Sequence, residues 1–127
     1  MSGAEFEERL LLHFQARGWQ LRTSRASGDF GADLVGTRPD GVGVVIQAKR
    51  WHGRVGVGAV QEVHGARDYY QAQLAMLITN STLTAPARDL AARTRVEVWD
   101  RERLIHELTK PPMDTPPTAT AGPKPQA

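Results

Sequence analysis

The feature that most constrains the fold is an apolar run in the middle of the chain, residues 44–49, with the sequence VVIQAK. Its β-branched residues favour an extended strand, and the flanking glycines allow the chain to turn. A strand this apolar is normally buried on both faces, so a polar side chain inside it needs a specific reason. Because side chains alternate along a strand, Gln47 and Lys49 should share one face, and Val44, Ile46 and Ala48 the other. The aliphatic set of side chains is therefore expected to pack in the core. The polar side chains at the carboxyl end of the other face are expected to take part in a functional site.

Lysine is scarce in this chain, which makes its presence in that strand more informative. Only Lys49, Lys110 and Lys124 are lysines, and the other 13 of the 16 basic residues are arginines. The net charge is only +2, yet residues 17–54 hold seven basic residues and three aspartates. A local basic excess suits a polyanionic partner, because the guanidinium fork matches phosphate geometry. The alternative is an arginine-rich surface without a specific partner.

Several classes of protein are excluded or disfavoured by composition. There is no cysteine, so disulfides, thiolate metal sites and a cysteine nucleophile are excluded. No apolar run approaches the roughly 20 residues that span a bilayer, and the acidic amino terminus does not resemble a signal peptide. A cytoplasmic protein with no membrane partner is expected. The four histidines lack the spacing of a zinc site.

Periodicity and turn residues predict one α/β domain over residues 1–110, followed by a disordered tail rich in Pro, Thr and Ala over residues 111–127. Ser2 and Glu5 have the spacing of a capping box that begins a first helix, and Gly18 should end it. The expected strands span residues 19–24, 32–35, 42–49, 74–79 and 96–99, and further helices span residues 59–72, 84–92 and 101–108. This order predicts a mixed central sheet flanked by helices.

The turn at residues 38–41 should pair the second and third strands as a hairpin, which would bring Asp33 beside Gln47 and Lys49. Carboxylate and amide oxygens are hard ligands that suit Mg²⁺. With a lysine ammonium beside them, they would favour attack of water on a phosphodiester. Taken singly, each residue also has a structural interpretation: Asp33 as a loop cap, Gln47 as a partner of the backbone, and Lys49 as a solvated strand end.

The same residues carry a resemblance to a known family. The segments GDFGADLV (residues 28–35) and QAKRW (residues 47–51) resemble the catalytic motif of Mrr-type (type IV) restriction endonucleases of the PD-(D/E)xK nuclease superfamily. In that branch glutamine replaces the usual acidic residue before the lysine. Weaker similarity extends to Phe6-Glu7, to residues 60–65, and to residues 78–81 followed by Ala87. The resemblance implies a restriction-endonuclease-like αβββαβ core with C-terminal helix-strand-helix elements.

The resemblance also implies roles for individual residues. Asp33 would be the metal-binding acid, Gln47 a metal ligand in place of the acid, and Lys49 the catalytic lysine. Glu7 would be an additional metal-binding carboxylate, although a solvated helix residue is the alternative. Gln61 would support the site or contact DNA. The implied cofactor is Mg²⁺, with Mn²⁺ as a substitute, and the neutral Gln47 predicts a single, weakly held ion.

The implied function is that of a metal-dependent DNA endonuclease of the restriction or repair type. Arg50, Trp51 and Arg54 are the expected DNA-binding residues, together with Gln61, and packing under the loop is an alternative for Trp51. The alternatives within this fold are a Holliday-junction resolvase-like nuclease and a non-catalytic DNA-binding module, and a protein-interaction module is a third. Cutting of both strands generally needs two active sites, which favours a homodimer.

Overall fold

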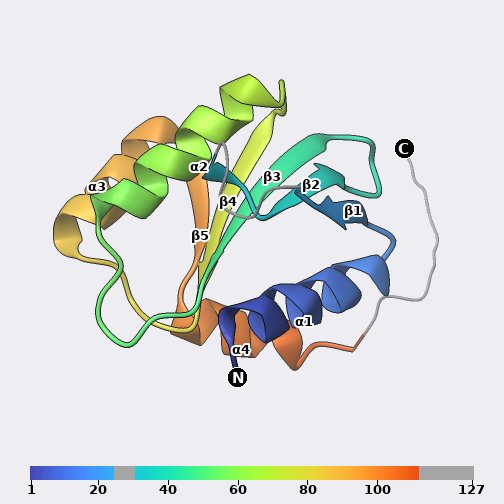
Figure 1. The fold of residues 1–127 in the computed structure, drawn as a ribbon, viewed down its shortest axis with the longest axis horizontal. Helices are drawn as coiled ribbons and strands as arrows, with labels where there is room; N and C mark the ends of the chain where they lie inside the picture. The colour runs from blue at the N-terminus through green and yellow to red at the C-terminus, as the bar shows by residue number, and fades with distance from the viewer. Residues whose placement is uncertain (25–30, 112–127) are drawn as a thin grey trace.

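The computed structural model describes residues 1–24 and 31–111 of the chain. They form one five-stranded sheet with helices on both faces (Figure 1). The elements in chain order are α1 (Gly3–Gln15), β1 (Gln20–Thr23), β2 (Leu34–Thr37), β3 (Gly43–Lys49), α2 (Val57–Tyr69), β4 (Leu74–Thr79), α3 (Ala85–Thr94), β5 (Val96–Trp99) and α4 (Arg101–Leu108).

The spatial order of the strands is the same as their order in the chain, β1-β2-β3-β4-β5. The pairs β1–β2 and β2–β3 are antiparallel, whereas β3–β4 and β4–β5 are parallel, each joined through a helix. In Figure 1, α2 and α3 cover one face of this sheet, and α1 and α4 lie on the other. The predicted mixed α/β fold is therefore confirmed.

Helix α1 begins where the capping box predicts. The Ser2 hydroxyl accepts a hydrogen bond from the Glu5 N–H at 3.1 Å, and the Glu5 carboxylate accepts one from the Ser2 N–H at 2.6 Å. The apolar stripe of the helix, Phe6, Leu10 and Phe14, is buried against the sheet. This stripe forms the core on the face that α1 and α4 cover.

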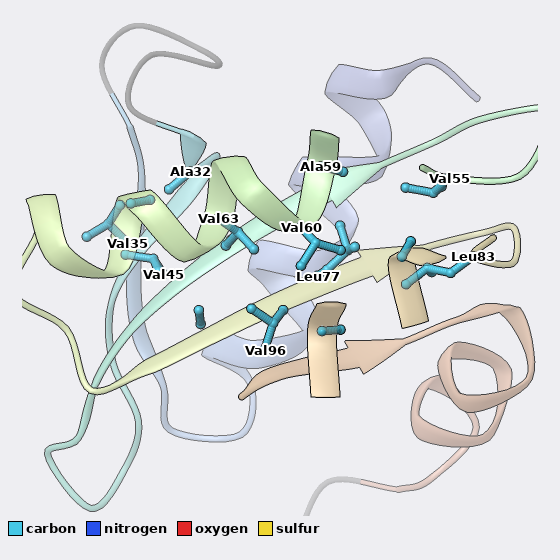
Figure 2. Packing of buried hydrophobic residues seen from close by; sticks show 14 residues of the cluster. Ala32, Val35, Val45, Val55, Ala59, Val60, Val63, Leu77, Leu83 and Val96 are labelled. Atoms are coloured by element: carbon cyan, nitrogen blue, oxygen red, sulfur yellow. The ribbon is translucent and has the colours of Figure 1, made fainter. Parts of the chain in front are cut away.

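The second core lies between the sheet and helices α2 and α3 (Figure 2). Val45 of β3 and Leu77 of β4 pack there with Val60 and Val63 of α2. Their strand neighbours Val44, Ile46, Met76 and Ile78 belong instead to the core under α1. Strand β3 thus presents alternate side chains to two separate apolar layers, as expected for a strand that is buried on both faces.

The structure shifts several predicted boundaries. Strand β2 begins at Leu34 rather than at residue 32, so Asp33 stands immediately before the strand. Helix α2 begins at Val57 because Gly56 takes the extended N-cap conformation, and the chain leaves the helix at Tyr70, just before Gln71 adopts a positive φ of 55°. Residues 28–30 of the GDFGADLV segment and nearly all of the predicted tail lie outside the described residues. No helix in the described ranges is long and apolar enough to cross a membrane.

We predict that Phe14→Ala lowers the free energy of unfolding by about 3–5 kcal/mol, because a large aromatic side chain leaves a cavity that the core refills poorly. Phe14 is 1% exposed and packs against Trp19 and Trp99 with ring centroids 4.5 and 5.4 Å apart. Urea unfolding measures the change. Leu12→Ala is the matched control on the same helix, since Leu12 is 58% exposed and its truncation should cost far less. Equal losses for the two variants would contradict this assignment of the core.

Candidate active site

Asp33 is held between the first and third strands by both its backbone and its side chain. Its N–H donates to the Ile46 carbonyl at 2.8 Å, and its carbonyl accepts from the Ser24 N–H at 2.9 Å. Its Oδ2 accepts a hydrogen bond of 2.8 Å from the backbone N–H of Ala48, the residue between Gln47 and Lys49. The carboxylate is thereby docked on the Gln-x-Lys segment, as the hairpin predicts.

Gly31, two residues earlier, allows this approach. It has a φ of +77°, a conformation that favours glycine, and its Cα faces the backbone of helix α2. A β-carbon at this position would stand 2.0 Å from the Glu62 carbonyl oxygen, which is far inside van der Waals contact. Only glycine therefore lets the chain pass this close to α2 on its way to Asp33.

Gln47 is buried, with 5% of its surface exposed, and its two amide atoms have different environments. Its Nε2 donates a hydrogen bond of 3.0 Å to Oε1 of Glu62 on α2. Its Oε1 is buried and has no hydrogen-bond partner among the described residues. An orphaned buried carbonyl oxygen is costly unless a ligand completes it, so this oxygen is a candidate metal ligand.

The end of strand β3 is fixed by Thr79 of β4, which stands opposite Lys49 in the parallel register. Thr79 is fully buried, and its hydroxyl donates to the Lys49 carbonyl at 2.6 Å. The Thr79 hydroxyl oxygen in turn accepts a hydrogen bond of 3.1 Å from the Ser81 N–H. This clamp holds the backbone that carries Lys49. Similarity to the family drew attention to residues 78–81, but no feature of the sequence alone indicated this contact.

The carboxylates near the site influence one another electrostatically. Burial raises the pKa of Asp33, and the nearby Glu62 carboxylate adds to the rise, whereas the Ala48 N–H and the Lys49 ammonium act in the opposite direction. Burial also raises the pKa of the half-buried Glu7, and the charge of Asp33 raises it further. Partly desolvated acids that repel one another are an environment that a bound cation would relieve.

The donor set fits a hard divalent cation held by few protein ligands. The part of the chain that the structure describes contains no group of three His, Cys, Asp or Glu residues that could hold a metal ion. The Asp33 carboxylate and the free Gln47 oxygen are two oxygen donors in the same region, and Glu7 on α1 interacts electrostatically with Asp33. Mg²⁺ characteristically takes one or two carboxylates and completes its shell with water and substrate oxygens.

A hollow of about 330 Å³ borders Lys49 at the start of α2. Trp51 and Arg54 also line it, together with Gly56, the N-cap of α2, which has no side-chain cap. The backbone N–H of Trp51 donates to Oδ1 of Asn80 at 2.8 Å, and the residue is 52% exposed. Lys49 therefore shares one concave surface with two of the residues predicted to bind DNA.

Two other predicted residues lie elsewhere. Arg50 lines a different, mainly apolar hollow of about 510 Å³, which also borders Leu10 of α1 and Leu104 of α4. Gln61 is exposed on α2, and the contact with Gln47 is made by its neighbour Glu62 instead. Sequence reasoning missed Glu62. The only available signal was its position in the helix after the active strand, which does not distinguish it from Gln61.

Comparison with known proteins identifies relatives of this chain. The restriction endonuclease family Mrr_cat matches residues 1–108. The type IV methyl-directed restriction enzyme EcoKMrr of Escherichia coli (strain K12) is 39% identical over 90 residues, which cover 68% of this chain and 29% of the enzyme. The chain thus spans less than a third of the length of this relative.

Solved structures share the fold. A repair endonuclease from Pyrococcus abyssi superposes with a TM-score of 0.61 at 20% identity, covering 79% of this chain and 46% of that protein. EndoMS, solved in complex with double-stranded DNA, superposes with a TM-score of 0.57 at 24% identity, covering 79% of this chain and 45% of that protein. At these identities the likeness establishes the fold.

We predict that Gly31→Ala destabilises the protein by more than about 1 kcal/mol, because alanine is strained at positive φ and its methyl group collides with α2. Gly65→Ala is the matched control, since a β-carbon at this exposed α2 position meets nothing within 4 Å. That change should stabilise by about 0.5–1 kcal/mol through helix propensity. Denaturant unfolding measures both changes, and a neutral Gly31→Ala would contradict the close packing.

We predict that Asp33→Asn raises the melting temperature of the metal-free protein at pH 7 by a few degrees. The folded-state pKa of Asp33 is raised, so its burial favours folding at low pH and opposes folding once the pH exceeds that pKa. Asparagine keeps an acceptor for the Ala48 N–H without the charge. The advantage should disappear below the ordinary carboxyl pKa.

Asp40→Asn is the opposing control for this experiment. The Arg38 side chain lowers the pKa of Asp40, so this carboxylate favours folding at neutral pH and its loss should not stabilise. Melting curves of both variants, recorded with a chelator across acidic to neutral pH, check the signs. If Asp33→Asn instead lowers the melting temperature at pH 7, the charge of the Asp33 carboxylate is compensated in the folded protein and the prediction is wrong.

Proposed function

The chain belongs to the Mrr_cat restriction endonuclease family, and from this premise we propose that it is a Mg²⁺-dependent DNA endonuclease. The observation that carries the proposal is the docking of Asp33 on the Ala48 N–H, beside the unpartnered Gln47 oxygen and Lys49. The donor set supports this choice of ion, and Mn²⁺ should substitute for it. We propose that the protein acts in the cytoplasm, where it would meet the DNA that it cleaves in restriction or repair.

The residues of the site would have different roles in phosphodiester hydrolysis. Asp33 and Gln47 would hold the ion through one carboxylate and one amide oxygen, with Glu7 as a further carboxylate on α1. When bound, the ion would supply Lewis-acid stabilisation of the negative charge that develops on the phosphate oxygens and would lower the pKa of the attacking water. The Lys49 ammonium donates hydrogen bonds to the water or to a phosphate oxygen, which orients the attack in line with the leaving group.

The hollow beside Lys49 supports a binding mode for the DNA backbone. Arg54 contributes positive charge to this hollow. The first N–H groups of α2 lack a side-chain cap, so they are free to donate hydrogen bonds to a phosphate bound there. The exposed Trp51 indole can stack on a base or pack against a sugar. Gln61 and Arg50 would contact DNA farther out. We propose that two copies act together when both strands are cut.

We predict that Lys49→Ala lowers the rate of Mg²⁺-dependent plasmid nicking by roughly 10²-fold or more while folding is retained. Lys110→Ala is the matched control, because Lys110 is an exposed lysine after α4 that pairs with Glu107. The assay compares methylated and unmethylated plasmids, since the E. coli relative is named as methyl-directed. Nicking by Lys49→Ala at the wild-type rate would refute the proposed role of this residue.

Two further substrates and one variant separate the alternatives. Preferential cleavage of a four-way junction over plain duplex would indicate a resolvase-like nuclease instead. If no DNA form is nicked with Mg²⁺ or Mn²⁺, and DNA binding persists without metal and in Asp33→Ala, the domain is a non-catalytic DNA-binding module. An absence of salt-dependent DNA binding would remove DNA as the partner altogether.

A further inference from the structure

The contact between Gln47 and Glu62 is not explained by the roles proposed so far. Gln47 is buried inside the sheet, whereas Glu62 is an exposed residue on α2, 15 positions later in the chain. Their hydrogen bond of 3.0 Å is the only one that the Gln47 side chain makes within the described residues. An exposed carboxylate on a helix thus reaches down to a buried amide at the centre of the site.

The bond decides which way the amide faces. A glutamine amide has a donor end and an acceptor end of almost the same shape, so either end can face a given neighbour. An ionised carboxylate only accepts hydrogen bonds, and it therefore requires the Nε2 end of Gln47 to face α2. The acceptor Oε1 then faces away from α2, and it has no hydrogen-bond partner among the described residues.

We propose that Glu62 is a positioning residue for the metal site, which orients Gln47 with its oxygen toward the cation and supplies the negative charge that Gln47 lacks. This inference rests on the proposed metal-dependent function. When the amide N–H donates a hydrogen bond to a carboxylate, the amide is polarised and the electron density at its oxygen increases, as partners of metal ligands commonly cause. The neutral amide and the helix carboxylate together carry the charge of one acidic ligand.

The place of Glu62 is fixed independently of this bond. Its backbone carbonyl lies against Gly31, so close that a β-carbon there would stand 2.0 Å away. Gly31 leads directly to Asp33, which is docked on the strand that carries Gln47. One helical residue therefore constrains both proposed ligands, through its backbone on one side and its carboxylate on the other.

The test measures Mn²⁺ affinity by electron paramagnetic resonance, without DNA and without turnover. We expect Glu62→Ala to weaken Mn²⁺ binding by about 10-fold or more. Glu62→Gln keeps an acceptor of similar shape and should lose less. Asp68→Ala is the matched control: it removes an exposed carboxylate from the same helix and should leave the affinity unchanged. Melting curves establish that each variant is folded.

A charge exchange distinguishes this role from a merely structural one. In Gln47→Glu combined with Glu62→Gln, the new amide donates to the new carboxylate, and the pair keeps its hydrogen bond and its single charge. We expect the double variant to bind Mn²⁺ at least as tightly as the wild type and more tightly than Glu62→Gln alone. The side-chain amide protons of Gln47, followed by NMR in the metal-free protein, should also lose protection from exchange in Glu62→Ala.

The outcomes separate failure of the inference from failure of the proposed function. Wild-type protein that binds no Mn²⁺ would overturn the metal site itself. Wild-type binding with unchanged affinity in Glu62→Ala, or with an equal loss in Asp68→Ala, would overturn the positioning role alone. A double variant no better than Glu62→Gln would show that the charge of Glu62 does not act through Gln47.

Discussion

The hydrogen bond from the Ala48 N–H to the Asp33 carboxylate is the interaction on which the site depends. Ile46 of β3 pairs with β2 through its backbone. Ala48 lies two residues later in the same strand, so its N–H points toward the same edge of β3, the edge that faces β2. A side-chain oxygen takes the place of a strand partner there, because β2 has not yet begun. The sheet ladder is thereby extended by one bond that also places a carboxylate beside Gln47 and Lys49. The cost of burying that carboxylate is visible in its raised pKa.

The location of the site follows from the change of strand direction at β3. This strand pairs antiparallel with β2 and parallel with β4, so its carboxyl end meets the start of β2 on one side and the end of β4 on the other. Asp33 comes from the first neighbour and Thr79 from the second. Side chains from three segments that are distant in sequence converge there, while both faces of β3 remain packed in apolar cores. Rigid strands with buried neighbours hold such groups more accurately than loops.

Much of the fold could be predicted because its signals are local. The capping box at Ser2, the continuous apolar run of β4 and the alternation within β3 each depend on residues close together in the chain. The predicted ends of β2 and α2 were wrong by a few residues because tertiary contacts, and not local sequence, determine where these elements begin and end. Asp33 was assigned to a strand, but its side chain rather than its backbone makes the bond to Ala48. The prediction that Gln47 and Lys49 share a face opposite Val44 and Ile46 agrees with the two cores.

By itself, the sequence determined the element order, the two-faced character of β3, and the approach of Asp33 to the segment that carries Gln47 and Lys49, because alternation and turn chemistry are properties of neighbouring residues. The tertiary structure alone decided which end of the Gln47 amide is free, and that Glu62 rather than Gln61 reaches it. The rotation of α2 about its axis sets that choice, and it depends on how Val60 and Val63 pack on the sheet and on the absence of a side chain at Gly31. Such packing involves segments far apart in the chain, so no local sequence pattern predicts it.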